Sequence, residues 1–182
     1  MRYKEYNSEV AWNLAARMGL VLAGLWTVSF LIVVLNIPSL LCDLGYLLGL
    51  MSVFVMGKNV RGIATYVMPM NWTQRLSLSL MSFMGCVLIT TLAQFLYLAF
   101  LDHGHFMHAM QESLTDPGLV KVMQDGGNGA LLQQATETIG QMADMSPRQL
   151  TISFFSSNMT LAFVFSLIAS MFRGRPEKSE GQ

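Results

Sequence analysis

The sequence predicts an all-α fold, a four-helix transmembrane bundle with a helical extracytoplasmic insert between spans 3 and 4. Three observations lead to this prediction: the composition, four long apolar segments, and the distribution of Lys and Arg between them. Of the 182 residues, 53% are hydrophobic and only 12% are charged, whereas a soluble domain carries about a quarter charged residues. We therefore interpret residues 1–182 as a single membrane domain in contact with the lipid bilayer.

Four segments are long and apolar enough to cross a bilayer, which takes about 20 residues in a helix. The first two are joined through Asn36 and Pro38, so they must form an antiparallel hairpin, and Pro38 is tolerated at a helix start. Residues 173–182 form a polar tail. The predicted spans are residues 15–35, 38–56, 76–101 and 149–172.

Orientation follows from the basic residues, because short loops rich in Lys and Arg stay in the cytoplasm. Residues 102–148 contain Lys121 and Arg148 as their basic residues, against six acidic ones. We therefore expect both termini on the cytoplasmic side and the 102–148 insert on the outside. The basic residues on which this expectation rests are Arg2, Lys4, Arg17, Lys58, Arg61, Arg75, Arg173, Arg175 and Lys178.

The insert has the pattern of three short helices. The first begins at His105, and the second opens with Asp116 as its N-cap and Pro117 as its first residue. After a glycine-rich break, an apolar stripe at helical spacing predicts the third helix. Such an amphipathic helix can pack on its own bundle, rest on the membrane, or dock a partner protein. The stripe consists of Leu131, Leu132, Ala135, Ile139 and Met142.

Rows of small residues mark where helices in a membrane approach closely. Gly19 and Ala23 form such a row in the first span, and Gly45 and Gly49 form one in the second. These rows predict either packing inside the protein or a homo-oligomer interface.

Two groups of residues are candidate sites. Asp43 lies in an apolar span near its outer end, and with Gln94 of the third span it is a candidate polar intramembrane site. His105, His108 and Glu112 fall on one helical face, where two imidazoles and a carboxylate can bind a transition metal such as copper. The ordinary interpretations are a hydrated helix end for Asp43 and a hydrated interfacial segment for the histidines.

The sequence contains no nucleophile-elbow, P-loop, dinucleotide-binding or zinc-protease motif. Eleven basic residues balance eleven acidic ones, which argues against binding to nucleic acid. We expect a protein that is not an enzyme and has no cofactor, acting as an accessory or scaffold component that contacts other envelope proteins. The alternatives are a small transporter or channel component formed by oligomerisation, and a metal-binding membrane protein.

The chain resembles a bacterial family of four-span membrane proteins, the domain-of-unknown-function family forty-one ninety-nine. The resemblance implies an integral protein of the inner membrane and carries no activity, cofactor or site residue; with the orientation expected from the basic residues, the insert would then lie in the periplasm. The similar features are a glycine-rich first hairpin, the loop at Lys58 to Arg61 leading to Met70 to Thr73, a third span ending in Tyr97 to Asp102, an acidic helical insert, and a fourth span with Ser157 to Met159 and Ser166 to Ala169 before a basic end.

Overall fold

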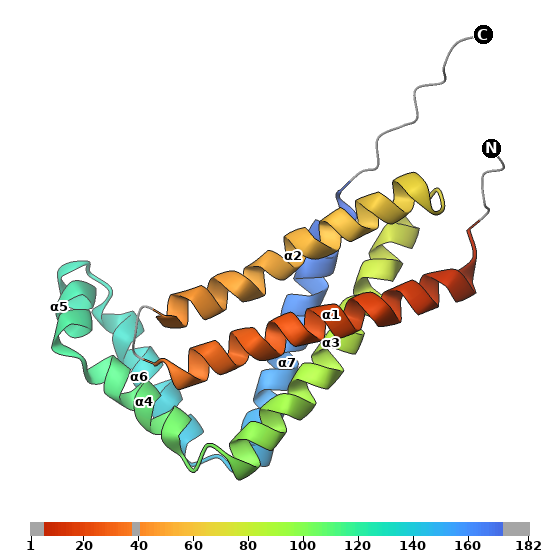
Figure 1. Cartoon of the computed structure of the whole chain (residues 1–182). Helices are drawn as coiled ribbons and strands as arrows, with labels where there is room; N and C mark the ends of the chain where they lie inside the picture. The colour runs from red at the N-terminus through yellow and green to blue at the C-terminus, as the bar shows by residue number, and fades with distance from the viewer. Residues whose placement is uncertain (1–5, 38–40, 173–182) are drawn as a thin grey trace, which may run out of the picture. The chain divides into compact units, whose positions relative to one another are not determined.

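The computed structural model describes residues 6–37 and 41–172. These residues form seven α-helices and no strand (Figure 1). The predicted all-α class is therefore confirmed, and four of the helices are long and apolar enough to cross a membrane. The helices are α1 (Ser8–Leu35), α2 (Leu41–Tyr66), α3 (Trp72–Phe100), α4 (His105–Thr115), α5 (Pro117–Asp125), α6 (Gly129–Ala143) and α7 (Pro147–Ser170).

Two of the long helices extend well beyond the apolar segments from which they were predicted. α1 begins at Ser8, and α2 continues through Lys58 and Arg61 to Tyr66. Hydropathy limits the part of a helix that can lie in lipid, whereas the backbone hydrogen bonds continue into polar sequence. Residues 57–66, which lie between the predicted second and third spans, are therefore helical and not part of a loop. The predicted helix start at Pro38 lies outside the described residues.

The helix starts explain why the sequence folds as it does locally. Asn71 and Gln74 form a reciprocal capping box at α3: each backbone N–H donates to the other's side-chain oxygen at 2.9 Å. Ser146 and Gln149 pair similarly at α7, where the Ser146 N–H donates to Gln149 Oε1 at 2.8 Å. Asp116 accepts from the Leu119 N–H at 2.9 Å, which confirms it as the N-cap of α5.

The chain divides into two compact units, which we describe separately. Unit 1 comprises Met1–Trp26, Leu48–Thr90 and Phe155–Gln182, and unit 2 comprises Thr27–Leu47 and Thr91–Phe154. Unit 2 therefore contains the three helices of the insert.

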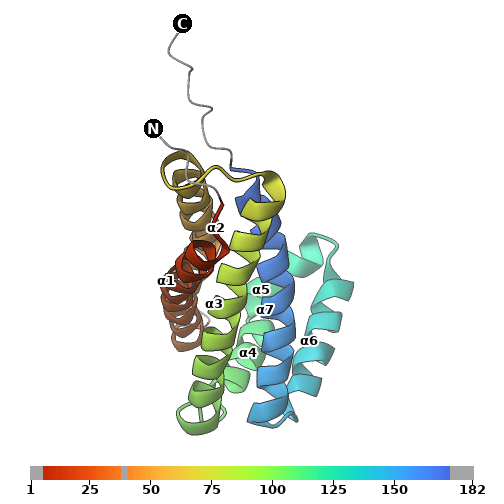
Figure 2. The ribbon, with the colours of Figure 1, turned by 90° about the vertical axis from the view of Figure 1, so that its right-hand side faces the viewer.

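The core of unit 1 is built on three aromatic rings. The centroid of Trp26 lies 6.0 Å from that of Phe83 and 6.0 Å from that of Phe165, and the two phenylalanines are 6.0 Å apart. Phe83 and Phe165 belong to α3 and α7, which run side by side in this unit (Figure 2). Tilted and edge-on ring pairs of this kind stabilise a core beyond their buried area.

One chain of hydrogen bonds crosses the apolar core of unit 1. The Trp26 indole Nε1–H donates to Ser52 Oγ at 2.9 Å, and the Ser52 hydroxyl donates to the Gly49 carbonyl at 2.6 Å. Ser52 is fully buried. Both polar side chains are thereby satisfied, as buried polar groups must be.

Unit 2 has its own aromatic core. Phe30 contacts Tyr97 and Phe154, with centroid distances of 5.6 and 6.3 Å, and Phe106 lies 5.7 Å from Phe154. Phe106 belongs to α4, so the first helix of the insert is anchored in this core. The helices α4, α5 and α6 also contact one another.

Large apolar side chains cover the outer surface of the long helices. Leu20, Phe54 and Leu88 are each more than 60% exposed. A soluble protein rarely exposes so many large apolar groups together, whereas a surface in contact with acyl chains requires them. This surface is as expected for an integral membrane protein.

Candidate functional site

A sharp turn ends α3 and starts the insert. His103 and Gly104 both have positive φ, 46° and 84°, and glycine takes this conformation without strain. Asp102, which is 6% exposed, holds the turn: Oδ1 accepts from the Phe106 N–H at 2.9 Å and Oδ2 accepts from the Gly104 N–H at 3.1 Å. Asp102 therefore fixes the direction in which α4 leaves α3.

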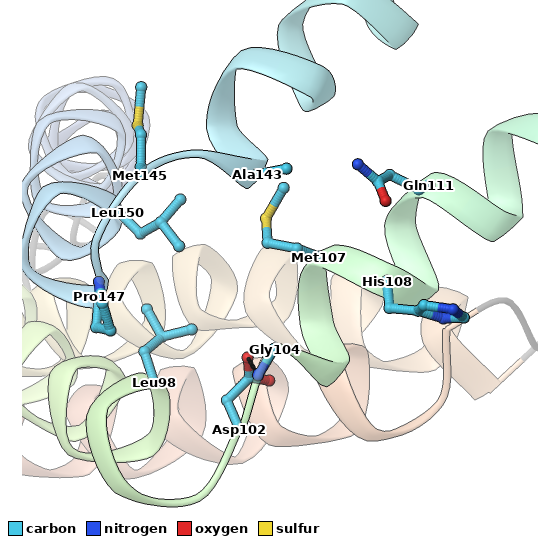
Figure 3. Close-up of a pocket in the computed structure, with 10 residues that line it drawn as sticks. All are labelled: Leu98, Asp102, Gly104, Met107, His108, Gln111, Ala143, Met145, Pro147 and Leu150. Atoms are coloured by element: carbon cyan, nitrogen blue, oxygen red, sulfur yellow. Dashed lines mark hydrogen bonds between the residues drawn. The ribbon is translucent and has the colours of Figure 1, made fainter.

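A pocket of about 370 Å³ lies beside this turn in unit 2. In Figure 3, Met107 lies centrally among the lining residues, close to Ala143, while His108 projects from α4 away from Leu98 and Leu150. More than half of the lining residues are apolar, and the oxygens of the one carboxylate among them, Asp102, already accept backbone hydrogen bonds. The lining residues come from the end of α3, α4, the end of α6, the start of α7 and the connections between these helices: Leu98, Asp102, Gly104, Met107, His108, Gln111, Ala143, Met145, Pro147 and Leu150.

The candidate metal ligands are only partly brought together. His108 Nδ1 lies 3.9 Å from Glu112 Oε2, and both side chains are highly exposed, at 81% and 68%. His105 is exposed in the first turn of α4. Within residues 6–37 and 41–172, no three His, Cys, Asp or Glu side chains are gathered so that they could hold a metal ion. The metal hypothesis therefore stays a prediction that this geometry does not support.

The two residues of the candidate intramembrane site have different surroundings. Asp43 is exposed in the first turn of α2, where the positive end of the helix favours a carboxylate. Gln94 is 6% exposed within α3. This placement agrees with the ordinary interpretation of Asp43 as a helix-end carboxylate, and the transporter hypothesis stays a prediction.

Two of the small residues, Gly45 and Gly19, lie against a neighbouring helix of their own unit. A Cβ added at Gly45 would lie 2.9 Å from the Ser29 carbonyl oxygen, and the Ser29 hydroxyl donates to the Gly45 carbonyl at 2.6 Å. A Cβ at Gly19 would lie 2.9 Å from the Ser82 carbonyl oxygen. Ala23 is buried, and Gly49 accepts from Ser52. These contacts are intramolecular, so they need no second copy of the chain.

Sequence reasoning missed the burial of two charged residues. Asp102 and Arg75 entered the prediction only as loop charges, yet Asp102 is 6% exposed and Arg75 is 8% exposed. Asp102 lies two residues before Gly104, the N-cap of α4, so the usual N-cap pattern does not identify it. No local sequence signal predicts the burial of Arg75, whose guanidinium donates to the carbonyl of Phe172, a residue far away in the chain.

Comparison with known proteins agrees with the resemblance found in the sequence. A family model described as "Protein of unknown function (DUF4199)" matches residues 17–173, which is most of the chain. No curated protein and no solved structure matches the chain. The all-helical fold, the four apolar helices and this match lead to one assignment: the chain belongs to the DUF4199 family.

Proposed function

We propose that the protein is a non-enzymatic accessory or scaffold component of the bacterial inner membrane. Its termini lie in the cytoplasm and its insert, residues 102–148, contacts other envelope proteins in the periplasm. The observation that carries the proposal is the exposed apolar surface of α5. This helix buries none of its residues, while Leu119 is 37% exposed and Val122 is 69% exposed.

The rest of the insert explains why α5 is presented rather than buried. α4 is anchored by Phe106, Met107 and Ala109, and α6 by Ile139, all of which are buried. α5 connects these two anchored helices and contacts both of them. A short helix held at both ends presents its side chains in a fixed arrangement, which lowers the entropy cost of binding.

Charge favours a protein partner over the membrane surface. The insert has six acidic residues against Lys121 and Arg148, and an acidic segment is repelled by anionic lipid headgroups. The partner that fits is a protein with an apolar patch bordered by basic residues. Complementary charge of this kind accelerates association and makes it sensitive to salt.

Photo-crosslinking in native membranes tests the proposal. A photoreactive amino acid at position 122 is expected to give a discrete adduct with another envelope protein, and more salt is expected to weaken it. Position 137 is the matched control, because Glu137 is also exposed in the insert but lies on the polar side of α6. Adducts only with phospholipid, only with a second copy, or equally from both positions would contradict the scaffold function.

A further inference from the structure

A buried arginine that has no counter-ion among the residues the structure describes lies at one end of unit 1. Arg75, in the first turn of α3, is 8% exposed, and its Nη1 donates to the Phe172 carbonyl at 3.1 Å. Within residues 6–37 and 41–172, the Arg75 Nε has no hydrogen-bond partner and no carboxylate forms an ion pair with the Arg75 side chain. Burying a guanidinium without an anion is costly, so this positive charge calls for one.

A second unsatisfied donor lies one helical turn further along α3. Ser79 is fully buried, and within the described part of the chain its hydroxyl has no hydrogen-bond partner. Residues four apart in a helix share a face, so Arg75 and Ser79 present their polar groups on the same side of α3. Arg75 and Ser79 thus supply one N–H of a cation and one O–H that have no hydrogen-bond acceptor among the described residues.

The surroundings hold the arginine in place. A Cβ at Gly57 would lie 2.6 Å from the Phe172 ring, so this ring packs directly on the α2 backbone. Phe54 adds an edge-on ring contact to Phe172 at 6.5 Å. Because Phe172 is fixed in this way, its carbonyl keeps the Arg75 guanidinium oriented.

The sequence places Arg75 at the depth of lipid phosphates. It immediately precedes the predicted third span, residues 76–101, on the side where Lys58 and Arg61 are exposed on α2. Arginine matches the oxygens of a phosphate with its planar fork of donors, and basic sites between helices on the cytoplasmic side bind anionic headgroups. We propose that Arg75 and Ser79 bind a phosphate group, either that of an anionic phospholipid or inorganic phosphate.

Native mass spectrometry of the full-length protein in mild detergent tests for the lipid source. Wild-type protein is expected to retain phosphatidylglycerol in preference to phosphatidylcholine, and Arg75→Gln to lower that retention about tenfold, as expected when a hydrogen bond to a charged group is lost. Arg61→Gln is the matched control, because Arg61 is exposed and makes no side-chain ion pair within the described residues. It is expected to change the retention less than Arg75→Gln does.

Titration with inorganic phosphate at constant ionic strength tests for the free anion. If inorganic phosphate raises the thermal unfolding midpoint of the wild type but not that of Arg75→Gln, inorganic phosphate alone is sufficient to occupy the site. Preferential retention of phosphatidylglycerol without such an increase would identify the phospholipid. Absence of both effects, or equal effects in wild type and Arg75→Gln, would overturn the proposal.

Ser79→Ala keeps the test decisive if Arg75→Gln does not fold. Without a phosphate ligand, removing an unsatisfied buried hydroxyl is expected to leave the unfolding midpoint unchanged or to raise it. Binding of phosphatidylglycerol or phosphate is nevertheless expected to weaken about threefold, because one hydrogen bond is lost. A folded Ser79→Ala protein that binds both ligands as the wild type does would exclude Ser79 from the site and overturn the proposal as stated.

Discussion

At the scale of single residues, the buried carboxylate of Asp102 organises the start of the insert. It accepts two backbone hydrogen bonds in a turn that contains two residues with positive φ. Removing it leaves the buried Phe106 N–H without its acceptor, and an unsatisfied buried donor costs more than the bond itself contributes.

We therefore expect Asp102→Ala to lower the free energy of unfolding by about 1 to 2 kcal/mol. SDS titration in mixed micelles measures this change. Asp144→Ala is the control, because Asp144 is exposed at the end of α6. Equal stability of the two variants would show that Asp102 does not act as a cap.

Gly45 gives a second prediction at this scale. A Cβ there would lie 2.7 Å from Val33 Cγ2 and 2.9 Å from a backbone oxygen, whereas a Cβ at Gly62 in the same helix would meet nothing within 4 Å. Gly45→Ala is expected to destabilise by about 1 kcal/mol or more through overpacking, and Gly62→Ala to stabilise by about 0.5 kcal/mol. The same SDS titration measures both, and an unchanged stability for Gly45→Ala would refute the close approach.

The sequence predicted the residues with local partners better than those with distant ones. Asp43 and Asp116 lie at helix starts as their sequence neighbours indicated. Arg75 is different, since its acceptor, Phe172, is 97 residues away in the chain. Pattern reasoning assigns a charge near a span to the loop, because burial of that charge depends on tertiary contacts that the local sequence does not contain.

At the scale of elements, helix boundaries depend on capping as much as on hydropathy. The reciprocal pair of Asn71 and Gln74 starts α3 ahead of its apolar segment, predicted from residue 76. A hydropathy window identifies only the apolar part of such a helix, which is the part that can lie in lipid. The existence of the four long helices was therefore predictable from the sequence, while their full extents were not.

The capping box of α3 makes a measurable prediction. Asn71→Ala is expected to cost about 1 kcal/mol of stability, because the Gln74 N–H loses its acceptor. Gln74→Ala removes the reciprocal bond, and the double variant is expected to cost less than the sum of the two single changes, because the residues act as a pair. A double-mutant cycle measured by SDS titration tests this coupling, and strict additivity would contradict it.

In the insert, the predicted apolar stripe of α6 is only partly covered by neighbouring residues. The apolar stripe of α6 is turned inward at Ile139, which is buried, and at Leu132, Ala135 and Met142, which are half-buried. Leu131 is 57% exposed although it belongs to the same stripe. Periodicity identifies the apolar face of a helix, but how far neighbouring helices cover that face depends on how those helices are placed.

At the scale of the whole molecule, the charge distribution predicts which side of the membrane each segment occupies. Lys58 and Lys121 are both exposed, in α2 and α5 respectively. In a background with Cys42→Ser and Cys86→Ala, we expect Lys121→Cys to react with a membrane-impermeant maleimide in spheroplasts. Lys58→Cys is expected to react only after the membrane is permeabilised.

A mass-tagged maleimide makes the labelling visible as a shift on a gel. The reverse pattern would place the insert in the cytoplasm, and labelling of both cysteines from outside would contradict an even number of spans. The two positions are matched, because each replaces an exposed lysine outside the predicted spans.

The hydrogen bonds of Trp26 have a consequence for how α1 and α2 align along their lengths. Two apolar helices in lipid can slide past each other at little cost, since each position offers similar contacts. Here a shift of α2 by one turn would replace Ser52 by Leu48 or Val55 opposite the indole, and neither side chain has an acceptor. With no water nearby to compensate, the orphaned N–H would cost several kcal/mol. The indole thus selects a single register for the first hairpin within unit 1.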